Sequence, residues 1–232
     1  MQARNIFLIK NIGQLQVLIM GALALTALVL SLLWLLTAFN SWKGVMLERR
    51  VNQGQSISPD TLLSVWDQIK EVDKAFLPGT HLHLPGLAGQ LIIMNQELPV
   101  ETRAEVLLRS EESIINALTR DPAQTFSWAR LAWFRHLEKG PSPEVVEALR
   151  MSIYTAPAKR SLLFWRIGMA GRSRMHWDQE FENLVRRQLI YGQRVSKTRL
   201  ENVAGESGLD DLVRATLNLY PPDIKDNNYL PK

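Results

Sequence analysis

The sequence predicts an all-α protein in which one apolar helix precedes an array of amphipathic helices. An uncharged run near the N-terminus is long enough to cross a membrane as a helix. In the remaining chain, apolar residues recur at spacings of three and four, and Ser-Pro, Asp-Pro and Gly-Pro pairs mark the helix boundaries. The chain has 232 residues, so the part after the apolar run is large enough to bury its own core.

The uncharged run covers residues 17–39 and is predicted to be a membrane anchor. As a helix rising about 1.5 Å per residue it reaches about 35 Å, slightly more than a hydrocarbon core of about 30 Å. The anchor residues are Val17, Gly21, Ala27, Leu30, Trp34 and Phe39. A buried core helix rarely needs so long an uncharged run. A cleaved signal peptide has a shorter apolar region ending in an A-x-A-like site, whereas this run ends in Leu-Thr-Ala.

Composition argues against a nucleic-acid partner and against cysteine chemistry. The chain has 27 basic and 23 acidic residues; Arg4 and Lys10 precede the anchor, whereas the first acidic residue is Glu48. The remaining 25 basic and 23 acidic residues nearly balance, while nucleic-acid binders concentrate a larger basic excess. Because the sequence has no cysteine, disulfides, thiolate zinc sites and cysteine nucleophiles are excluded.

The charges that flank the anchor do not decide its topology. Arg4 and Lys10 precede it, and Lys43, Arg49 and Arg50 follow it, so the positive-inside rule favours neither orientation. A short tail before a single anchor commonly stays in the cytoplasm. We therefore expect the N-terminus in the cytoplasm and the larger domain on the other side of the membrane.

Four segments are predicted: a cytoplasmic tail with the anchor in residues 1–42, a juxtamembrane helix and linker in 43–100, a helical domain in 101–220, and a tail in 221–232.

In the second segment, Ser58, Pro59 and Asp60 favour a helix start, because they supply a capping hydroxyl, a preset φ and a carboxylate at the positive helix end. The helix should reach about residue 77, with a stripe of Leu62, Val65, Trp66, Ile69, Val72 and Phe76.

Residues 78–99 are predicted to be a linker or docking loop, because proline and glycine interrupt them repeatedly. A short helix or strand at residues 87–98 is the alternative. His81 and His83 lie two residues apart in this stretch, but a metal site needs more ligands than these. We therefore expect no metal site and no cofactor.

Beyond residue 100 the helical period returns, and breaks at proline and glycine separate six expected helices. These helices cover residues 101–120, 126–139, 143–156, 162–169, 177–191 and 209–219. The last residues combine prolines with polar residues, which is typical of a frayed tail.

Two of the proline breaks, Pro122 and Pro157, are 35 residues apart and follow similar helices. A period near 34 residues, with small residues at fixed positions and a closing proline, resembles the tetratricopeptide family, whose fold is an α-solenoid of helix pairs. The matching positions are Ser110, Ile114, Ala117, Pro122, Trp128, Leu131, Ala132 and Pro157. Three features depart from the pattern: Ser152 stands where Ala is usual, an insertion surrounds the segment GPSP, and Trp165 is displaced by two positions.

The sequence is also similar to VpsP-type proteins, which are membrane proteins encoded in bacterial exopolysaccharide clusters. The similarity lies in the order of an anchor, an extension and the segments LTRDPAQTFSWARLAWF, PSPEVVEALRMSIYTAPAK and LLFWRIGMA. That resemblance implies an accessory role in polysaccharide synthesis or export. It also implies a single-pass protein of the bacterial inner membrane with a periplasmic domain.

Residues 159–199 carry ten basic residues against three acidic ones. They indicate a basic surface for anionic lipid, an acidic glycan or a protein partner, at Arg172, Arg174, Arg186 and Arg187. The alternative is a solvated helical face with local salt bridges, which the acidic residues near the C-terminus could partly neutralise. Most tryptophans fall in apolar helical stripes and are expected in the core, and Trp177 is expected to be the most exposed.

No arrangement of residues typical of catalysis is found, since serine and histidine occur without a nucleophile elbow and no glycine-rich loop fits a nucleotide motif. We therefore expect a non-catalytic membrane-anchored scaffold whose helical domain binds protein partners. Two alternatives stay open: a structural subunit of a larger membrane complex, whose anchor packs through Ala22, Thr26, Ala27 and Ser31, and a domain that binds an anionic glycan.

Overall fold

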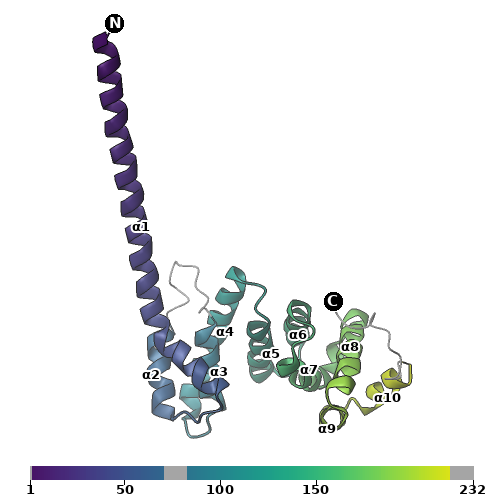
Figure 1. Cartoon of the computed structure of the whole chain (residues 1–232). Coiled ribbons are helices and arrows are strands. Elements are labelled where there is room, and N and C mark those ends of the chain that lie inside the picture. The colour runs from purple at the N-terminus through teal and green to yellow at the C-terminus, as the bar shows by residue number, and fades with distance from the viewer. Residues whose placement is uncertain (1, 71–82, 220–232) are drawn as a thin grey trace.

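The computed structural model describes residues 2–70 and 83–219, and every element in these residues is a helix. This confirms the all-α class and the long apolar helix at the N-terminus. Figure 1 shows α1 projecting from one end of a row of helices, with α9 and α10 at the far end. The helices are α1 (Gln2–Asn52), α2 (Pro59–Ile69), α3 (Leu84–Met94), α4 (Val100–Arg120), α5 (Thr125–Lys139), α6 (Pro143–Thr155), α7 (Arg160–Arg172), the 3-10 helix η2 (Arg174–His176), α8 (Gln179–Val195), α9 (Lys197–Ser207) and α10 (Asp210–Leu219).

Helix α1 is 51 residues long and contains the predicted anchor. Its segment Gln16–Leu36 has a mean hydropathy of 2.4 and no buried residue, so it is long and apolar enough to span a membrane or to act as a signal sequence. Val17 and Phe39, at the two ends of the predicted anchor, are 73% and 74% exposed. The helix does not end where the anchor was predicted to end but continues to Asn52.

The last turns of α1 belong to the core of the helical domain. Ser41, Gly44 and Leu47 are buried on the side of α1 that packs against α2 and α3. A Cβ atom at Gly44 would lie 2.8 Å from Cδ1 and 3.2 Å from Cβ of Leu84, so the glycine allows α3 to pack closely without a shift of the Leu84 side chain. The apolar helix and the first helix of the domain are therefore one continuous element.

Helix α2 begins as the sequence predicts. The Ser58 hydroxyl accepts a hydrogen bond from the backbone N–H of Thr61, and Pro59 occupies the first turn. Within the expected stripe, Leu62, Val65, Trp66 and Ile69 are buried, and Val72 and Phe76 lie outside the described residues. The described helix ends at Ile69.

Residues 84–94 form the buried helix α3, which agrees with the alternative of a short helix in this stretch and not with a linker or docking loop. Pro85 lies in the first turn, where its missing N–H is not needed. Gly86 and Gly89 face α4, and Cβ atoms there would lie 2.1 Å from Cδ1 of Ile114 and 1.7 Å from Oγ of Ser110. The glycines that indicate a loop in the sequence therefore allow two helices to pack closely.

Helix α4 joins two hydrophobic clusters. Val106 belongs to the cluster formed with the end of α1, α2 and α3, whereas Ile114 and Leu118 belong to the larger cluster that extends through α10. The sequence did not predict α9, whose buried residues are only Leu200 and Ala204. Such a short buried stripe gives a weak periodic signal.

The turns around Pro122 and Pro157 have nearly the same backbone conformation. The residues before the prolines, Asp121 and Ala156, have φ and ψ of −140° and 84° and of −156° and 79°. The residues that precede α5 and α7, Gln124 and Lys159, have −77° and 92° and −74° and 97°. The sequence period of 35 residues therefore corresponds to a repeated local structure at these two turns.

The guanidinium of Arg166 joins three helices in the interior. Arg166 on α7 is 1% exposed, and its Nε and Nη1 donate to Oγ of Ser152 at 3.1 Å and to the carbonyl of Ala156 at 2.9 Å. Its Nη2 donates to the Thr125 hydroxyl on α5 and to the Ser152 carbonyl on α6. Because burial is not offset by a carboxylate, the pKa of Arg166 is lowered to about 10, which leaves it protonated at neutral pH.

A second arginine with little exposure links α6 to α8. Arg150 donates through Nη2 to Asp178 at 2.6 Å and through Nη1 to Glu180 at 2.9 Å. Asp178 is also the N-cap of α8, where it accepts from the backbone N–H of Phe181. The same carboxylate therefore starts one helix and holds a neighbouring helix against it.

We expect Arg166→Met to lower the free energy of unfolding by about 2 kcal/mol, because acceptors on α5 and α6 lose their donor in a buried region. Urea unfolding of the detergent-solubilised chain, followed by circular dichroism, measures this. Arg172→Met, an exposed change in the same helix, serves as the control and should stay within about 0.5 kcal/mol of the parent chain. Equal effects of the two changes would contradict the role given to Arg166.

We expect Gly89→Ala to destabilise the chain by about 1–3 kcal/mol, because the added methyl group overlaps Ser110. Gly205→Ala is the matched control, since its Cβ would meet only Asp210 at 3.9 Å. That change should be neutral or stabilising by up to about 1 kcal/mol, as alanine is the better helix former. The midpoint temperature of thermal unfolding should therefore fall clearly in Gly89→Ala and should rise or stay unchanged in Gly205→Ala.

Candidate partner-binding groove

An open groove of about 1010 Å³ lies between the end of α1, α3 and the N-terminal ends of α5 and α7. We call it the partner groove. Its walls include Glu48 of α1, Gln90 of α3, Phe126 and Arg130 of α5, and Trp165 of α7. Apolar walls with a few convergent polar groups are typical of binding sites.

Arg130 is one of the charged groups that line the partner groove. Its Nε donates to Oε1 of Gln90 at 3.1 Å, but its buried Nη1 has no hydrogen-bond partner among the described residues. Burial lowers the pKa of Arg130 to about 10, and the charge of Glu48 opposes this shift. The guanidinium is therefore protonated at neutral pH and keeps unused hydrogen-bonding capacity beside an open groove.

A polar pair connects α1 to α3 at the edge of the groove. Nε2 of His83, the residue before α3, lies 3.2 Å from Oε1 of Glu48. The side chain of His83 is 16% exposed and that of Glu48 is 36% exposed. His81 lies outside the described residues, and no group of three histidine or carboxylate side chains in the described part of the chain could hold a metal ion.

The other wall of the groove is apolar and aromatic. Phe126, at the start of α5, is 40% exposed, and Nζ of Lys159 lies 5.1 Å from the centre of its ring. Met94, at the end of α3, is 62% exposed. These side chains offer a cation over an aromatic ring and an adaptable thioether for contact with a partner's apolar side chains.

The positions matched to the tetratricopeptide pattern lie mainly in the core. Ser110, Ile114, Ala117, Leu131 and Ala132 are buried, Trp128 is half-buried, and Pro122 and Pro157 lie in the two equivalent turns. Nε1 of Trp128 donates to the carbonyl of Pro122 at 2.8 Å, so this tryptophan fastens α5 to the turn before it. These residues hold the helices that form the groove, but they do not line it.

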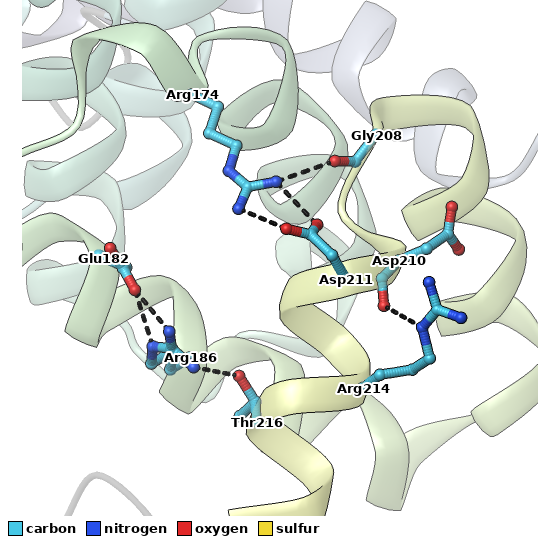
Figure 2. Close-up of polar contacts among 8 residues, drawn as sticks. All are labelled: Arg174, Glu182, Arg186, Gly208, Asp210, Asp211, Arg214 and Thr216. Atoms are coloured by element: carbon cyan, nitrogen blue, oxygen red, sulfur yellow. Dashed lines mark hydrogen bonds and ion pairs between the residues drawn. The ribbon is translucent and has the colours of Figure 1, made fainter.

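The four arginines of the predicted basic surface divide into two kinds. Arg174 and Arg186 are held in contacts that fasten α10, whereas Arg172 and Arg187 are exposed. Arg174 donates to both oxygens of Asp211 at 2.8 and 2.9 Å (Figure 2). The structure therefore does not bring these four residues together as one free basic surface.

Arg186 makes the second contact with α10. It donates to Oε1 of Glu182 at 2.6 and 3.0 Å and to the Thr216 hydroxyl at 2.9 Å (Figure 2). Trp177, expected to be exposed, is half-buried: its Nε1 donates to the carbonyl of Ala170 at 3.1 Å, and its ring packs edge-on against Phe181. The acidic residues near the C-terminus thus neutralise part of the basic segment.

The sequence did not identify the polar residues of the partner groove as a site. Glu48, His83, Gln90 and Arg130 come from separate parts of the chain, and none belongs to a local motif. The one available signal was Arg130 itself, a charged residue between the buried residues Ala129 and Leu131 of a helix.

No protein-family model matches this chain, and no curated protein or solved structure matches it.

We expect the ion pair between Arg174 and Asp211 to make part of the stability depend on acid pH. The Arg174 guanidinium lowers the pKa of Asp211 from 3.8 to about 2 in the folded chain. The pair therefore contributes fully above the unfolded value near 3.8, and this contribution is lost as the pH falls towards 2.

Thermal unfolding measured across this pH range tests the expectation. The melting temperature of the parent chain should fall more steeply than that of Asp211→Asn, which has no carboxylate to protonate. Asp210→Asn is the control, because the Asp210 carboxylate points away from Arg174 (Figure 2) and its loss leaves the pair intact. Parallel curves for the parent chain and Asp211→Asn would show that the pair does not affect stability.

Proposed function

We propose that this chain is a non-catalytic scaffold, anchored by α1 as a single-pass membrane protein, whose helical domain binds a protein partner in the partner groove. The observation that carries the proposal is Arg130, a half-buried cation that lines the open groove and whose buried Nη1 has no hydrogen-bond partner among the described residues. Keeping a charge at reduced hydration costs stability, so a cation retained at this place favours a role in binding an acidic group.

The continuity of α1 supports a retained anchor over a cleaved signal sequence. The residues that follow Gln16–Leu36 are helical and lead directly into the buried residues Ser41 and Leu47. Proteolytic cleavage concentrates in exposed loops, whereas this junction is a helix. A cytoplasmic N-terminus and a periplasmic domain stay a prediction.

The tetratricopeptide-like architecture is part of the proposal. Two equivalent turns 35 residues apart and small residues at the helix contacts support it. A preformed helical groove loses little chain entropy when a partner docks, and a shared membrane raises the partner's effective concentration. A role in bacterial exopolysaccharide synthesis or export stays a prediction from the VpsP-type resemblance.

The geometry favours a protein partner over an anionic glycan. The arginines Arg174 and Arg186 are engaged by Asp211 and Glu182, which reduces the basic charge available to a polyanion. The partner groove instead combines the cations Arg130 and Lys159 and the carboxylates Glu48 and Asp121 with aromatic and aliphatic walls. Such a mixture suits an extended protein segment with an acidic and an apolar side chain.

A structural subunit of a larger membrane complex is the second candidate. One observation favours it: the segment Gln16–Leu36 is exposed on all sides, so its small residues Ala22, Ala27 and Ser31 are available to another membrane helix. A subunit of this kind should be present at a fixed ratio to its complex.

We expect Arg130→Met to reduce partner capture without reducing stability. A photo-crosslinking amino acid at Phe126 would capture the partner in native membranes, and the same label at Leu108, which is exposed but does not line the groove, is the positional control. The Arg130→Met background should reduce crosslinking at position 126 about tenfold, as the loss of one charged hydrogen bond predicts.

The free energy of unfolding of Arg130→Met should stay unchanged or rise by up to about 3 kcal/mol, because a poorly hydrated charge is removed. Arg187→Met, which removes an exposed charge outside the groove, should change neither crosslinking nor stability. Equal crosslinking at positions 126 and 108, or no effect of Arg130→Met on it, would contradict the proposed site.

A further inference from the structure

A second groove, of about 430 Å³, runs along the first turns of α1 that follow the apolar segment. We call it the juxtamembrane groove and define it by Trp42, Lys43, Met46 and Arg50 of α1 and by Thr61 and Ser64 of α2. Met46 follows Trp42 by four residues and Lys43 by three, and Arg50 follows Met46 by four, so the α1 residues lie on one side of the helix. Helix α2 returns along this face, since Nζ of Lys43 lies 3.5 Å from Oγ of Ser64.

The end of the juxtamembrane groove nearest the apolar segment lies at the level of lipid headgroups. Trp42 follows Phe39, the end of the predicted anchor, by three residues, which is about 4.5 Å of helix. The headgroup region of one leaflet is about 5–8 Å thick. Trp42 is 57% exposed, as an indole at a membrane interface should be. Arg50 lies about 12 Å further along α1, and helical side chains tilt towards the N-terminus, here towards the membrane.

The charge of the groove favours an anion. Lys43 and Arg50 line it with one acidic residue, Asp60, and neither cation forms an ion pair with another residue in the described part of the chain. The hydroxyls of Thr61 and Ser64 add hydrogen-bonding groups on the opposite wall. Because Gly44 and Leu47 are packed into the core, both walls keep their relative position.

We propose that the juxtamembrane groove binds the headgroup of an anionic phospholipid of the phosphatidylglycerol type. Lys43 would contact the phosphodiester, Thr61 and Ser64 the polar headgroup, and Trp42 the membrane interface. Arg50 would add positive potential from the far end of the groove. The inference rests on the proposed membrane anchoring of α1, but not on the partner or on the exopolysaccharide role. A bound headgroup would fix the rotation of α1 and therefore the direction in which the partner groove faces.

Native mass spectrometry of the full chain in detergent, titrated with phosphatidylglycerol or phosphatidylcholine, tests the proposal. The parent chain should retain phosphatidylglycerol preferentially. Lys43→Gln combined with Arg50→Gln should weaken retention about 30-fold, or about fivefold for each cation. Lys43→Arg should retain the lipid, because the charge is kept. Unchanged circular dichroism melting curves would show that the variants are folded.

The matched control combines Arg172→Gln with Arg187→Gln, which removes two exposed charges far along the chain from α1. It should bind phosphatidylglycerol like the parent chain. Equal losses in the two double variants would show a general charge effect and overturn the proposal, as would equal retention of the two lipids by the parent chain.

Carbonate extraction of native membranes separates this failure from failure of the anchor. A chain that remains in the pellet but shows no lipid preference would overturn the headgroup site alone. A chain released into the supernatant would overturn the anchoring and the headgroup site together.

Discussion

The close packing of Gly44 against Leu84 joins α1 to the helical domain, and the rest of the structure is positioned by this contact. A Cβ at residue 44 would lie 2.8 Å from the Leu84 side chain, which would then have to move. With the contact made, Leu47 enters the same cluster as α2, α3 and the first half of α4. Helix α4 then carries the packing into the second cluster and the remaining helices.

The partner groove depends on the same contact, because α1 contributes Glu48 to its wall. Glu48 lies twelve residues beyond Leu36, so this wall is about 18 Å along the helix from the apolar segment. In the proposed arrangement, a partner bound in the groove therefore lies close to the membrane surface. The cost of keeping Arg130 at reduced hydration fits the proposed binding role, since sites commonly keep features that do not favour the free protein.

The features predicted correctly from sequence are those encoded by neighbouring residues. The apolar run gave the long N-terminal helix, and the Ser-Pro pairs at residues 58 and 142 gave the starts of α2 and α6 with their capping hydroxyls. Asp121 and Pro122 correctly marked the end of α4. Each of these signals acts within one turn of helix, so periodicity and capping rules detect it.

The features that were missed depend on contacts between distant parts of the chain. Gly86 and Gly89 were interpreted as helix breakers, because the residues that explain them, Ser110 and Ile114, lie on another helix. Arg166 was counted with a basic surface, although acceptors on α5 and α6 hold it inside. The groove residues were not found for the same reason, since only the fold brings α1, α3, α5 and α7 together.

The central claim is that the apolar helix and the helical domain form one rigid body. Pulsed electron paramagnetic resonance tests it most directly, with spin labels on Met20→Cys in α1 and Leu137→Cys in α5, both exposed positions in a chain without native cysteine. In lipid nanodiscs we expect a single narrow distance distribution. A broad or multiple distribution would show a hinge after the apolar segment and would contradict the account.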